Sequence, residues 1–143
     1  PLDAETKRCP DRDDIEKLLP GLDLVSIVSE WQECLSIVAL QAMAAKVPVM
    51  SNFIGSMDEI ITDNQTGFFY PSLDPDTLAK RILEIIPNTE LRKQTALAGS
   101  DRVRKKFTVD RMTEQFTQLF DEMLAMDLRQ THQIGFLRRI LSS

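Results

Sequence analysis

Short runs of apolar and β-branched residues recur through the first half of the chain, and they are separated by runs with helical spacing. The apolar runs predict strands at residues 24–28, 47–50 and 66–70. The helical runs predict helices at residues 11–19, 37–46, 57–61, 90–106 and 109–124, and one that starts at Pro75. Strands that alternate with helices in this way are typical of an α/β fold, with a parallel sheet and right-handed crossovers.

Two of these helices have features that sharpen the prediction. Residues 37–46, IVALQAMAAK, place apolar side chains on nearly every face, so we expect this helix to be buried. Asp74 stands directly before Pro75, which combines a capping residue with a residue favoured in the first turn. This pair predicts a helix start at that point.

Composition narrows the function classes. The chain has 143 residues, a length that favours one compact domain with its own core, and its formal net charge is −5. The acidic balance argues against a sequence-independent nucleic-acid binder, because such a protein needs excess Lys and Arg to neutralise phosphates. Cys9, Cys34 and His132 provide neither a disulfide framework nor a zinc site, so we expect no structural metal.

The ends of the chain suggest how it is organised. No apolar run approaches the ~20 residues that span a bilayer, and no signal segment opens the chain, so we expect a cytoplasmic protein. The first residue is Pro1, which favours a fragment or a processed product. We expect one domain over residues 1–126 and a helical extension or tail over residues 127–143. In this tail Arg138 and Arg139 stand beside apolar residues, which allows peripheral contact with an anionic membrane as one alternative.

The loops after the predicted strands are the first place to look for chemistry, because ligands of parallel α/β sheets bind beyond the carboxyl ends of the strands. The loop at residues 29–36 leads into the helix at 37–46, and the N-terminal N–H groups of a helix suit a phosphate. Glu33 in this loop can accept hydrogen bonds from hydroxyl groups. The loop at residues 53–59 repeats the arrangement with Gly55. Together the loops indicate a ligand that is both hydroxylated and phosphorylated.

A series of short motifs, in order and without large gaps, carries a family resemblance between about residues 11 and 124. The matching residues are Ser29, Glu33, Ala42-Met43-Ala44, Pro48-Val49, Gly55, Glu59, Thr66-Gly67, Pro71, Asp74-Pro75, Leu78-Ala79 and residues 102–107. With these motifs the chain resembles the C-terminal half of the group 1 glycosyltransferases of the GT-B fold. The resemblance implies a truncated doubly wound, Rossmann-like parallel sheet followed by C-terminal helices.

The resemblance also implies a donor site and a reaction. The positions that would bind the donor sugar and its diphosphate are Glu33, Cys34, Leu35, Ser36 and Ile37. Gln41 stands where the family has a second glutamate, which holds the ribose. The implied enzyme is a retaining glycosyltransferase that needs no metal or cofactor. It would transfer a hexosyl group from a nucleotide-sugar donor to a saccharide or lipid-linked acceptor.

Several positions depart from the family pattern. Gln41 lacks the charge that strengthens a hydrogen bond to the ribose. Cys34, Ser36, Ser56 and Lys46 stand where the family usually has glycine. The basic residues that neutralise the donor phosphates lie upstream in the family, as does the acceptor domain. We therefore expect the isolated chain to be inactive and to need an N-terminal GT-B domain as its partner. The alternative is a non-catalytic binding or scaffold domain derived from a glycosyltransferase.

For several residues a structural role competes with a functional one. Glu33 could cap the following helix, and Gln41 could be a hydrogen-bonded core amide. The sequence favours Trp31 as a loop anchor over a stacking platform. It also favours Cys34 as a packed thiol, because no histidine lies nearby to activate it. A phospho-receiver domain is excluded, since no acidic pair follows an opening strand.

Overall fold

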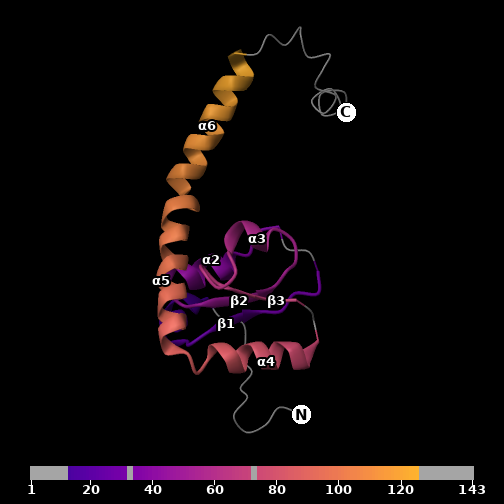
Figure 1. Ribbon diagram of the computed structural model, residues 1–143. Coiled ribbons are helices and arrows are strands. Elements are labelled where there is room, and N and C mark those ends of the chain that lie inside the picture. Colours follow the sequence, from indigo (N-terminus) through magenta and orange to yellow (C-terminus); the bar gives the residue numbers. More distant parts are fainter. Residues whose placement is uncertain (1–12, 32–33, 72–73, 126–143) are drawn as a thin grey trace. The chain divides into compact units, whose positions relative to one another are not determined.

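The computed structural model describes residues 13–31, 34–71 and 74–125 (Figure 1). These residues form two compact units, one reaching to Lys106 and the other starting at Phe107. The domain boundary expected at residue 126 stays a prediction, because residues 126–143 lie outside the described part of the chain.

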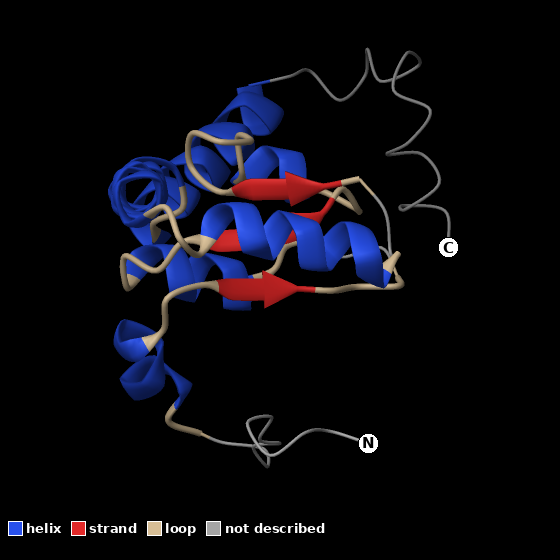
Figure 2. Ribbon diagram, turned by 60° about the horizontal axis from the view of Figure 1, so that its bottom comes forward, coloured by secondary structure: helices blue, strands red, loops and turns tan. Residues whose placement is uncertain are grey.

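The first unit is built on a small parallel sheet. Its strands, in spatial order, are β1 (Val25–Ile27), β2 (Val49–Asn52) and β3 (Phe68–Tyr70). Both pairings are parallel, and the arrows in Figure 2 accordingly point the same way. The register places Asn52 at the end of β2 opposite Tyr70 at the end of β3. The predicted α/β class with a parallel sheet is therefore confirmed.

Helices cover both faces of this sheet. The helices of this unit are α1 (Ile15–Leu18), the 3-10 turn η1 (Leu19–Gly21), α2 (Ile37–Ala44), α3 (Met57–Ile60), α4 (Pro75–Ile85) and α5 (Thr89–Lys106). In Figure 1, α2 and α3 lie on one side of the strands and α4 on the other. Strand β2 is consequently buried along its whole length, as expected for a central strand of a parallel sheet.

One hydrophobic cluster fills the space between the sheet and α4. Its buried members are Met50, Phe68, Tyr70 and Ile85, and Leu24, Leu78, Ile82 and Leu91 pack against it. The helix start predicted at Asp74 is confirmed, because the Asp74 carboxylate accepts a hydrogen bond from the Thr77 N–H at 2.9 Å. This cap fixes the end of α4 that follows β3.

Helix α2 is only partly buried, so the prediction of a fully buried helix is wrong. Ala39, Ala42 and Met43 are buried, whereas Ile37 is 66% exposed and Val38 is 48% exposed. The helix packs against the strands and α5 through one stripe only. An apolar composition shows how much of a helix can be buried. It does not show that another element among the described residues packs against every apolar face.

The end of α2 explains why β2 starts later than predicted. Lys46 has a φ of 60°, the left-handed conformation in which helices often terminate. Beyond it, the Val47 N–H donates to the Ala42 carbonyl at 2.9 Å and so belongs to the helix end. Pro48 has no N–H to give to the sheet. The strand therefore begins at Val49 rather than at residue 47.

The second unit contains the helix α6 (Val109–Ala125), close to the helix predicted at residues 109–124. Its apolar residues follow three- and four-residue steps and are exposed; they are Val109, Met112, Phe116, Leu119, Phe120, Met123 and Leu124. The rings of Phe116 and Phe120 stack with centroids 6.2 Å apart. None of the helices in residues 13–31, 34–71 and 74–125 is long and apolar enough to cross a membrane.

Candidate functional site

The predicted donor loop starts where β1 ends and leads into α2. Glu33, to which the resemblance assigns the sugar, lies outside the described residues. Cys34 is exposed and Leu35 is 52% exposed, so both are open to a ligand. The interpretation of Cys34 as a packed thiol is therefore wrong.

The first turn of α2 presents its amide groups next to this loop. Ser36 is 6% exposed, and its Oγ accepts a hydrogen bond from the Ala39 N–H at 3.5 Å. The side chain of Ser36 thus caps the helix. The first N–H groups of any helix have no acceptor within it, and here they adjoin an exposed loop. This is the local geometry in which a helix N-terminus can receive an anion.

Gln41 lies on an open face of α2. Its side chain is exposed, so the interpretation as a core amide is wrong. Ile37, which is also exposed, precedes Gln41 by four residues, and residues four apart on a helix are neighbours. The structure therefore brings two of the predicted donor-binding positions together on one accessible surface beside the loop.

The start of the loop is held by a side chain from the neighbouring strand. Asn52, at the end of β2, is 3% exposed. Its Nδ2 donates to the Ser29 carbonyl at 2.7 Å, and its Oδ1 accepts from the Ser29 N–H at 3.3 Å. The Asn52 amide therefore both donates a hydrogen bond to the backbone of Ser29 and accepts one from it.

A second side chain reaches the end of β1. The hydroxyl of Tyr70, which is 1% exposed, donates to the Ile27 carbonyl at 3.2 Å. Burial raises the pKa of the Tyr70 phenol, although a backbone hydrogen bond from Asn52 opposes this shift. The phenol therefore keeps its proton at neutral pH and remains a donor. Sequence reasoning missed both Asn52 and Tyr70, although each is a polar side chain at the carboxyl end of a strand.

The second loop, which follows β2, is exposed as well. Gly55 has a φ of 66°, a conformation that glycine adopts without strain. Phe53 is 64% exposed and meets Phe69 edge to face, with ring centroids 4.9 Å apart. Glu59 is exposed, and its backbone carbonyl accepts from Arg102 Nη2 at 2.7 Å. The carboxylate of Glu59 consequently has access to solvent on the short helix α3.

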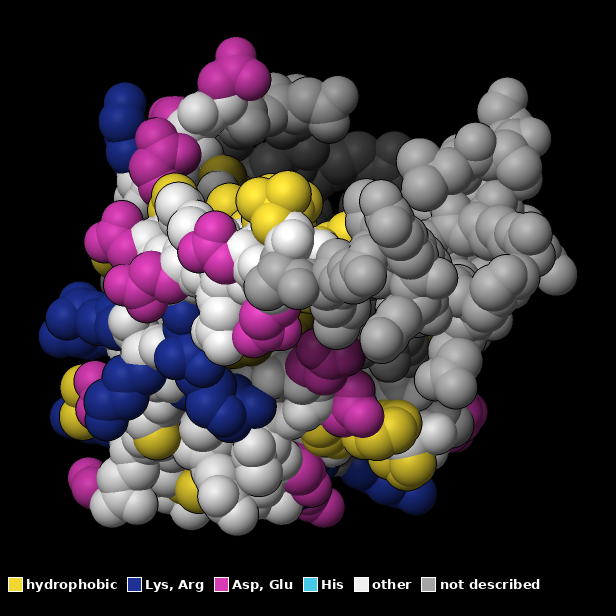
Figure 3. Space-filling model, turned by 90° about the horizontal axis from the view of Figure 1, so that it is seen from above, with side chains coloured by type: hydrophobic (Ala, Val, Ile, Leu, Met, Phe, Trp, Pro, Cys, Tyr) yellow, Lys and Arg dark blue, Asp and Glu magenta, His cyan; other side chains and the backbone are white. Residues whose placement is uncertain are grey.

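Trp31 projects from the donor loop. It is 82% exposed, so it does not anchor the loop through burial, and that prediction is wrong. Val28, just before the loop, is 53% exposed. Hydrophobic side chains also interrupt the charged and polar surface in the view of Figure 3. Large exposed aromatic and aliphatic side chains are a common property of binding surfaces.

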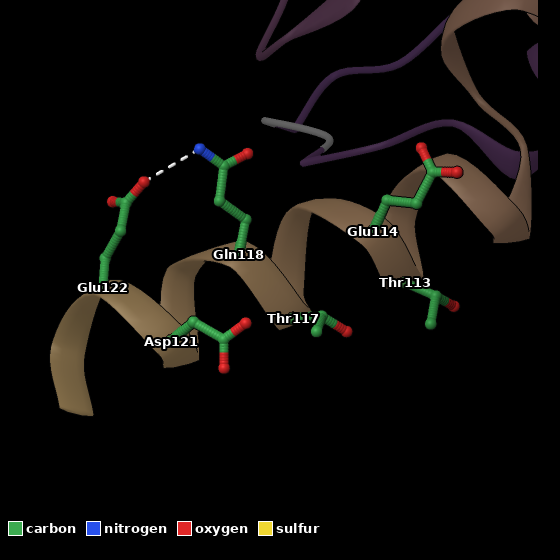
Figure 4. Close-up of a pocket in the computed structure, with 6 residues that line it drawn as sticks. All are labelled: Thr113, Glu114, Thr117, Gln118, Asp121 and Glu122. Carbon is green, nitrogen blue, oxygen red and sulfur yellow. Dashed lines mark hydrogen bonds between the residues drawn. The ribbon is translucent and has the colours of Figure 1, made fainter. Parts of the chain in front are cut away.

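A hollow of about 440 Å³ lies elsewhere, along one side of α6 (Figure 4). Its lining residues are Thr113, Glu114, Thr117, Gln118, Asp121 and Glu122. The Gln118 amide donates to Glu122 at 2.8 Å. The hollow is lined by one helix and carries three carboxylates, so it is unsuited to a diphosphate. It contains none of the predicted donor-binding residues.

The described residues hold no cluster of three or more His, Cys, Asp and Glu side chains that could bind a metal ion. The expectation that the reaction needs no metal remains a prediction.

The fold and the site together define a class of protein: a parallel α/β domain in which an exposed loop leads into the N-terminus of a helix. The family model for glycosyl transferases group 1 matches residues 6–102. The chain belongs to this family.

Relatives with defined names share this region. The chain is 25% identical to N-acetyl-alpha-D-glucosaminyl L-malate synthase of Bacillus anthracis, over 81% of this chain and 30% of the relative. It is 29% identical to D-inositol 3-phosphate glycosyltransferase of Salinispora arenicola, over 79% of this chain and 25% of the relative. The matched region thus spans between a quarter and a third of these relatives.

Solved structures extend the comparison to the fold. A glycosyltransferase from Rickettsia africae matches with a TM-score of 0.74 and 26% identity, covering 80% of this chain and 31% of that one. Anabaena Alr3699/HepE in complex with UDP also gives a TM-score of 0.74, at 24% identity over 78% of this chain and 30% of that one. The predicted fold, part of a GT-B glycosyltransferase, is confirmed.

Proposed function

We propose that this chain forms the nucleotide-sugar-binding part of a glycosyltransferase. The complete protein transfers a hexosyl group to a saccharide or lipid-linked acceptor, with retention of configuration and without a metal ion or cofactor. The observation that carries this proposal is the family match over residues 6–102, together with the exposed loop that leads into the N-terminus of α2.

The geometry around α2 supports a donor with both hydroxyl and phosphate groups. Its first-turn N–H groups adjoin the loop and can bind the distal phosphate, and Glu33 can accept hydrogen bonds from sugar hydroxyls. Gln41 lies on the open face of the helix, where its amide can bind the ribose. The HepE structure in complex with UDP supports a uridine diphosphate sugar as the first donor to test.

The reaction needs groups from outside these 143 residues. We assign the acceptor site and the residues that neutralise the leaving phosphates to an N-terminal GT-B domain of the complete protein, and we assign that protein to the cytoplasm. On this proposal the isolated chain is inactive. Chelation of divalent cations should leave the turnover of the complete protein unchanged.

The variant Glu33→Ala in the complete protein tests the site. We expect turnover with the preferred nucleotide sugar to fall about 100-fold or more, because hydrogen bonds to the sugar are lost at the reacting centre. The melting temperature should stay nearly unchanged, because on this proposal the Glu33 carboxylate binds the donor rather than another part of the domain. Donor turnover and thermal unfolding are the two measurements.

Glu30→Ala is the matched control. Glu30 is an exposed glutamate of the same loop, so the control removes the same charge three residues away. Its donor turnover should remain within about twofold of wild type. Unchanged turnover in Glu33→Ala, or equal losses in the two variants, would contradict the assignment of Glu33.

The alternative function, a non-catalytic binding or scaffold domain, rests on the uncharged Gln41, on Cys34 and on the family motifs that lie upstream of this chain. If Gln41 binds the ribose, Gln41→Glu should tighten donor binding about fivefold, since a charged acceptor forms a stronger hydrogen bond. Calorimetric titration with UDP-glucose measures the change. No donor binding in either protein would favour the non-catalytic alternative.

A further inference from the structure

The root of the donor loop is fixed by side chains that lie outside the motifs of the loop itself. β1 ends at Ile27, and Ser29 lies two residues beyond it. Asn52 is the last residue of β2, and its buried amide contacts both the N–H and the carbonyl of Ser29. The Asn52 side chain therefore continues the pairing between the two strands after their backbones separate.

An amide side chain is well suited to this task. It carries an NH2 group that donates and a carbonyl oxygen that accepts, so it can replace both hydrogen bonds of a missing backbone partner. At 3% exposure the side chain of Asn52 has little competing water. The bond from Nδ2 to the Ser29 carbonyl, at 2.7 Å, is the shorter of the two.

Tyr70 acts on the same segment from the next strand. It lies opposite Asn52 in the register, and its hydroxyl reaches past β2 to the Ile27 carbonyl on β1. Two buried side chains from adjacent strands thus bind the backbone at residues 27 and 29. These contacts set the point and the direction in which the loop leaves the sheet.

We propose that Asn52 is a positioning residue for the nucleotide-sugar donor, assisted by Tyr70. Asn52 holds the Ser29 peptide and so fixes the start of the loop, at residues 29–31, where the chain leaves β1. Neither side chain touches the donor. This proposal rests on the proposed function, because the loop that Asn52 holds is the predicted donor loop.

The placement has a defined consequence for binding. A donor that contacts the loop on one side and the α2 amides on the other needs both at a fixed separation. If the start of the loop is released, the donor must order it on binding, and this weakens affinity without removing any direct contact. The effect therefore falls on donor affinity and KM more than on kcat.

The test compares Asn52→Ala with Asn88→Ala in the complete protein. Asn88 caps α5, and its Oδ1 accepts from the Leu91 N–H at 3.0 Å. The control thus removes the same side chain and a bond to backbone at a place away from the loop. Tyr70→Phe, which removes only the hydroxyl, is the second test variant.

Two readings are taken from each protein. Hydrogen exchange at the Ser29 amide, without ligand, should be about tenfold faster in Asn52→Ala than in wild type, because that N–H loses its acceptor. Affinity for UDP-glucose should fall about tenfold in Asn52→Ala and about threefold in Tyr70→Phe, with kcat changed less than KM. Asn88→Ala should match wild type in both the exchange rate at Ser29 and the affinity for UDP-glucose, even if its melting temperature falls as far as that of Asn52→Ala.

The outcomes separate the two proposals. If wild type binds UDP-glucose and Asn52→Ala binds it equally well, the positioning role is wrong and the proposed function stands. Equal exchange at Ser29 in both proteins would also overturn the role of Asn52. If the wild-type protein binds neither UDP-glucose nor another nucleotide sugar, the proposed function fails, and the donor role of Asn52 fails with it.

Discussion

Two connections in the first unit differ in how they are held. The turn at residues 62–67, ahead of β3, closes on itself, since the Thr62 N–H donates to Thr66 Oγ1 at 2.8 Å. Asp63 accepts from the Phe69 N–H at 2.8 Å. Arg81 of α4 then joins the turn to the helix through Asn64 Oδ1 at 2.7 Å.

Among the described residues of the donor loop at residues 29–36, the first and the last take part in hydrogen bonds that hold the loop. Asn52 binds its first residue and Ser36 caps the helix at its last, while Trp31, Cys34 and Leu35 between them are exposed. The two connections therefore differ in role. Contacts within the fold hold the turn, whereas the exposed side chains of the loop are available to a ligand. The variants below test this comparison, in order of decreasing expected effect.

Arg81→Ala should have the largest effect on stability. It removes bonds to Phe69 O at 3.2 Å, to Asp63 and to Asn64, and the stacking of the guanidinium over the Phe68 ring at 5.7 Å. We expect the free energy of unfolding to fall by about 2 kcal/mol, measured by urea denaturation. Donor affinity should stay within about twofold of wild type. A loss of affinity as large as that of Asn52→Ala would erase the distinction between the two connections.

Lys46→Gly should stabilise the other end of α2. Lys46 occupies the left-handed conformation at φ 60°, which disfavours side chains. Glycine removes this strain but gains freedom in the unfolded state, so we expect a net stabilisation of about 0.5–1 kcal/mol. Thermal unfolding measures it, and Lys46→Ala is the control that keeps a Cβ and should show no such gain. Destabilisation by glycine would mean that the Lys46 side chain makes a compensating contact.

Trp31→Ala should have the opposite effects to Arg81→Ala, with little change in stability and a loss of turnover. Because Trp31 is 82% exposed, the free energy of unfolding should change by less than about 0.5 kcal/mol. Turnover by the complete protein should fall, since the largest side chain of the loop is removed. Trp31→Phe should restore part of the turnover if the ring stacks on a substrate. A large stability loss would show instead that this indole is a structural anchor.

The smallest effect concerns Asp74 and pH. Hydrogen bonds from the Thr77 hydroxyl, and then from the Thr77 N–H, lower the pKa of the Asp74 carboxyl. A pKa lowered by folding gives stability that is present above the unfolded value and is lost as the pH falls through the folded value. Asp74→Asn keeps a capping side chain but does not titrate. Its melting temperature should therefore approach that of wild type as the solution becomes acidic, and a constant gap from pH 7 to pH 2 would contradict this.

Periodicity and capping residues predicted much of the fold. The helices at 90–106 and 109–124 match α5 (Thr89–Lys106) and α6 (Val109–Ala125) closely, because both have long patterns. Asp74 and Pro75 located the start of α4, because a cap is a local interaction. The predicted start of β2 was two residues too early. The left-handed backbone conformation of Lys46 ends α2 there, and lysine is not a residue type that indicates this conformation.

The site was harder to predict than the fold. The family motifs pointed to the loop and to Gln41, which the structure places on an exposed helix face. Whether Ile37, Trp31 and Cys34 are exposed depends on which other parts of the chain pack against them. A local sequence pattern does not contain that information. Asn52 and Ser29 are 23 residues apart in sequence, and their contact depends on the register of β1 and β2. Such a contact becomes visible only once the strands are paired.

The most direct test of the donor site is a map of amide hydrogen exchange in the complete protein, with and without UDP-glucose or whichever nucleotide sugar binds most tightly. We expect the donor to slow exchange in residues 29–41 by about tenfold or more and to leave exchange in the turn at residues 62–67 unchanged. Slowed exchange in the turn, with none in residues 29–41, would contradict the assignment of the donor site.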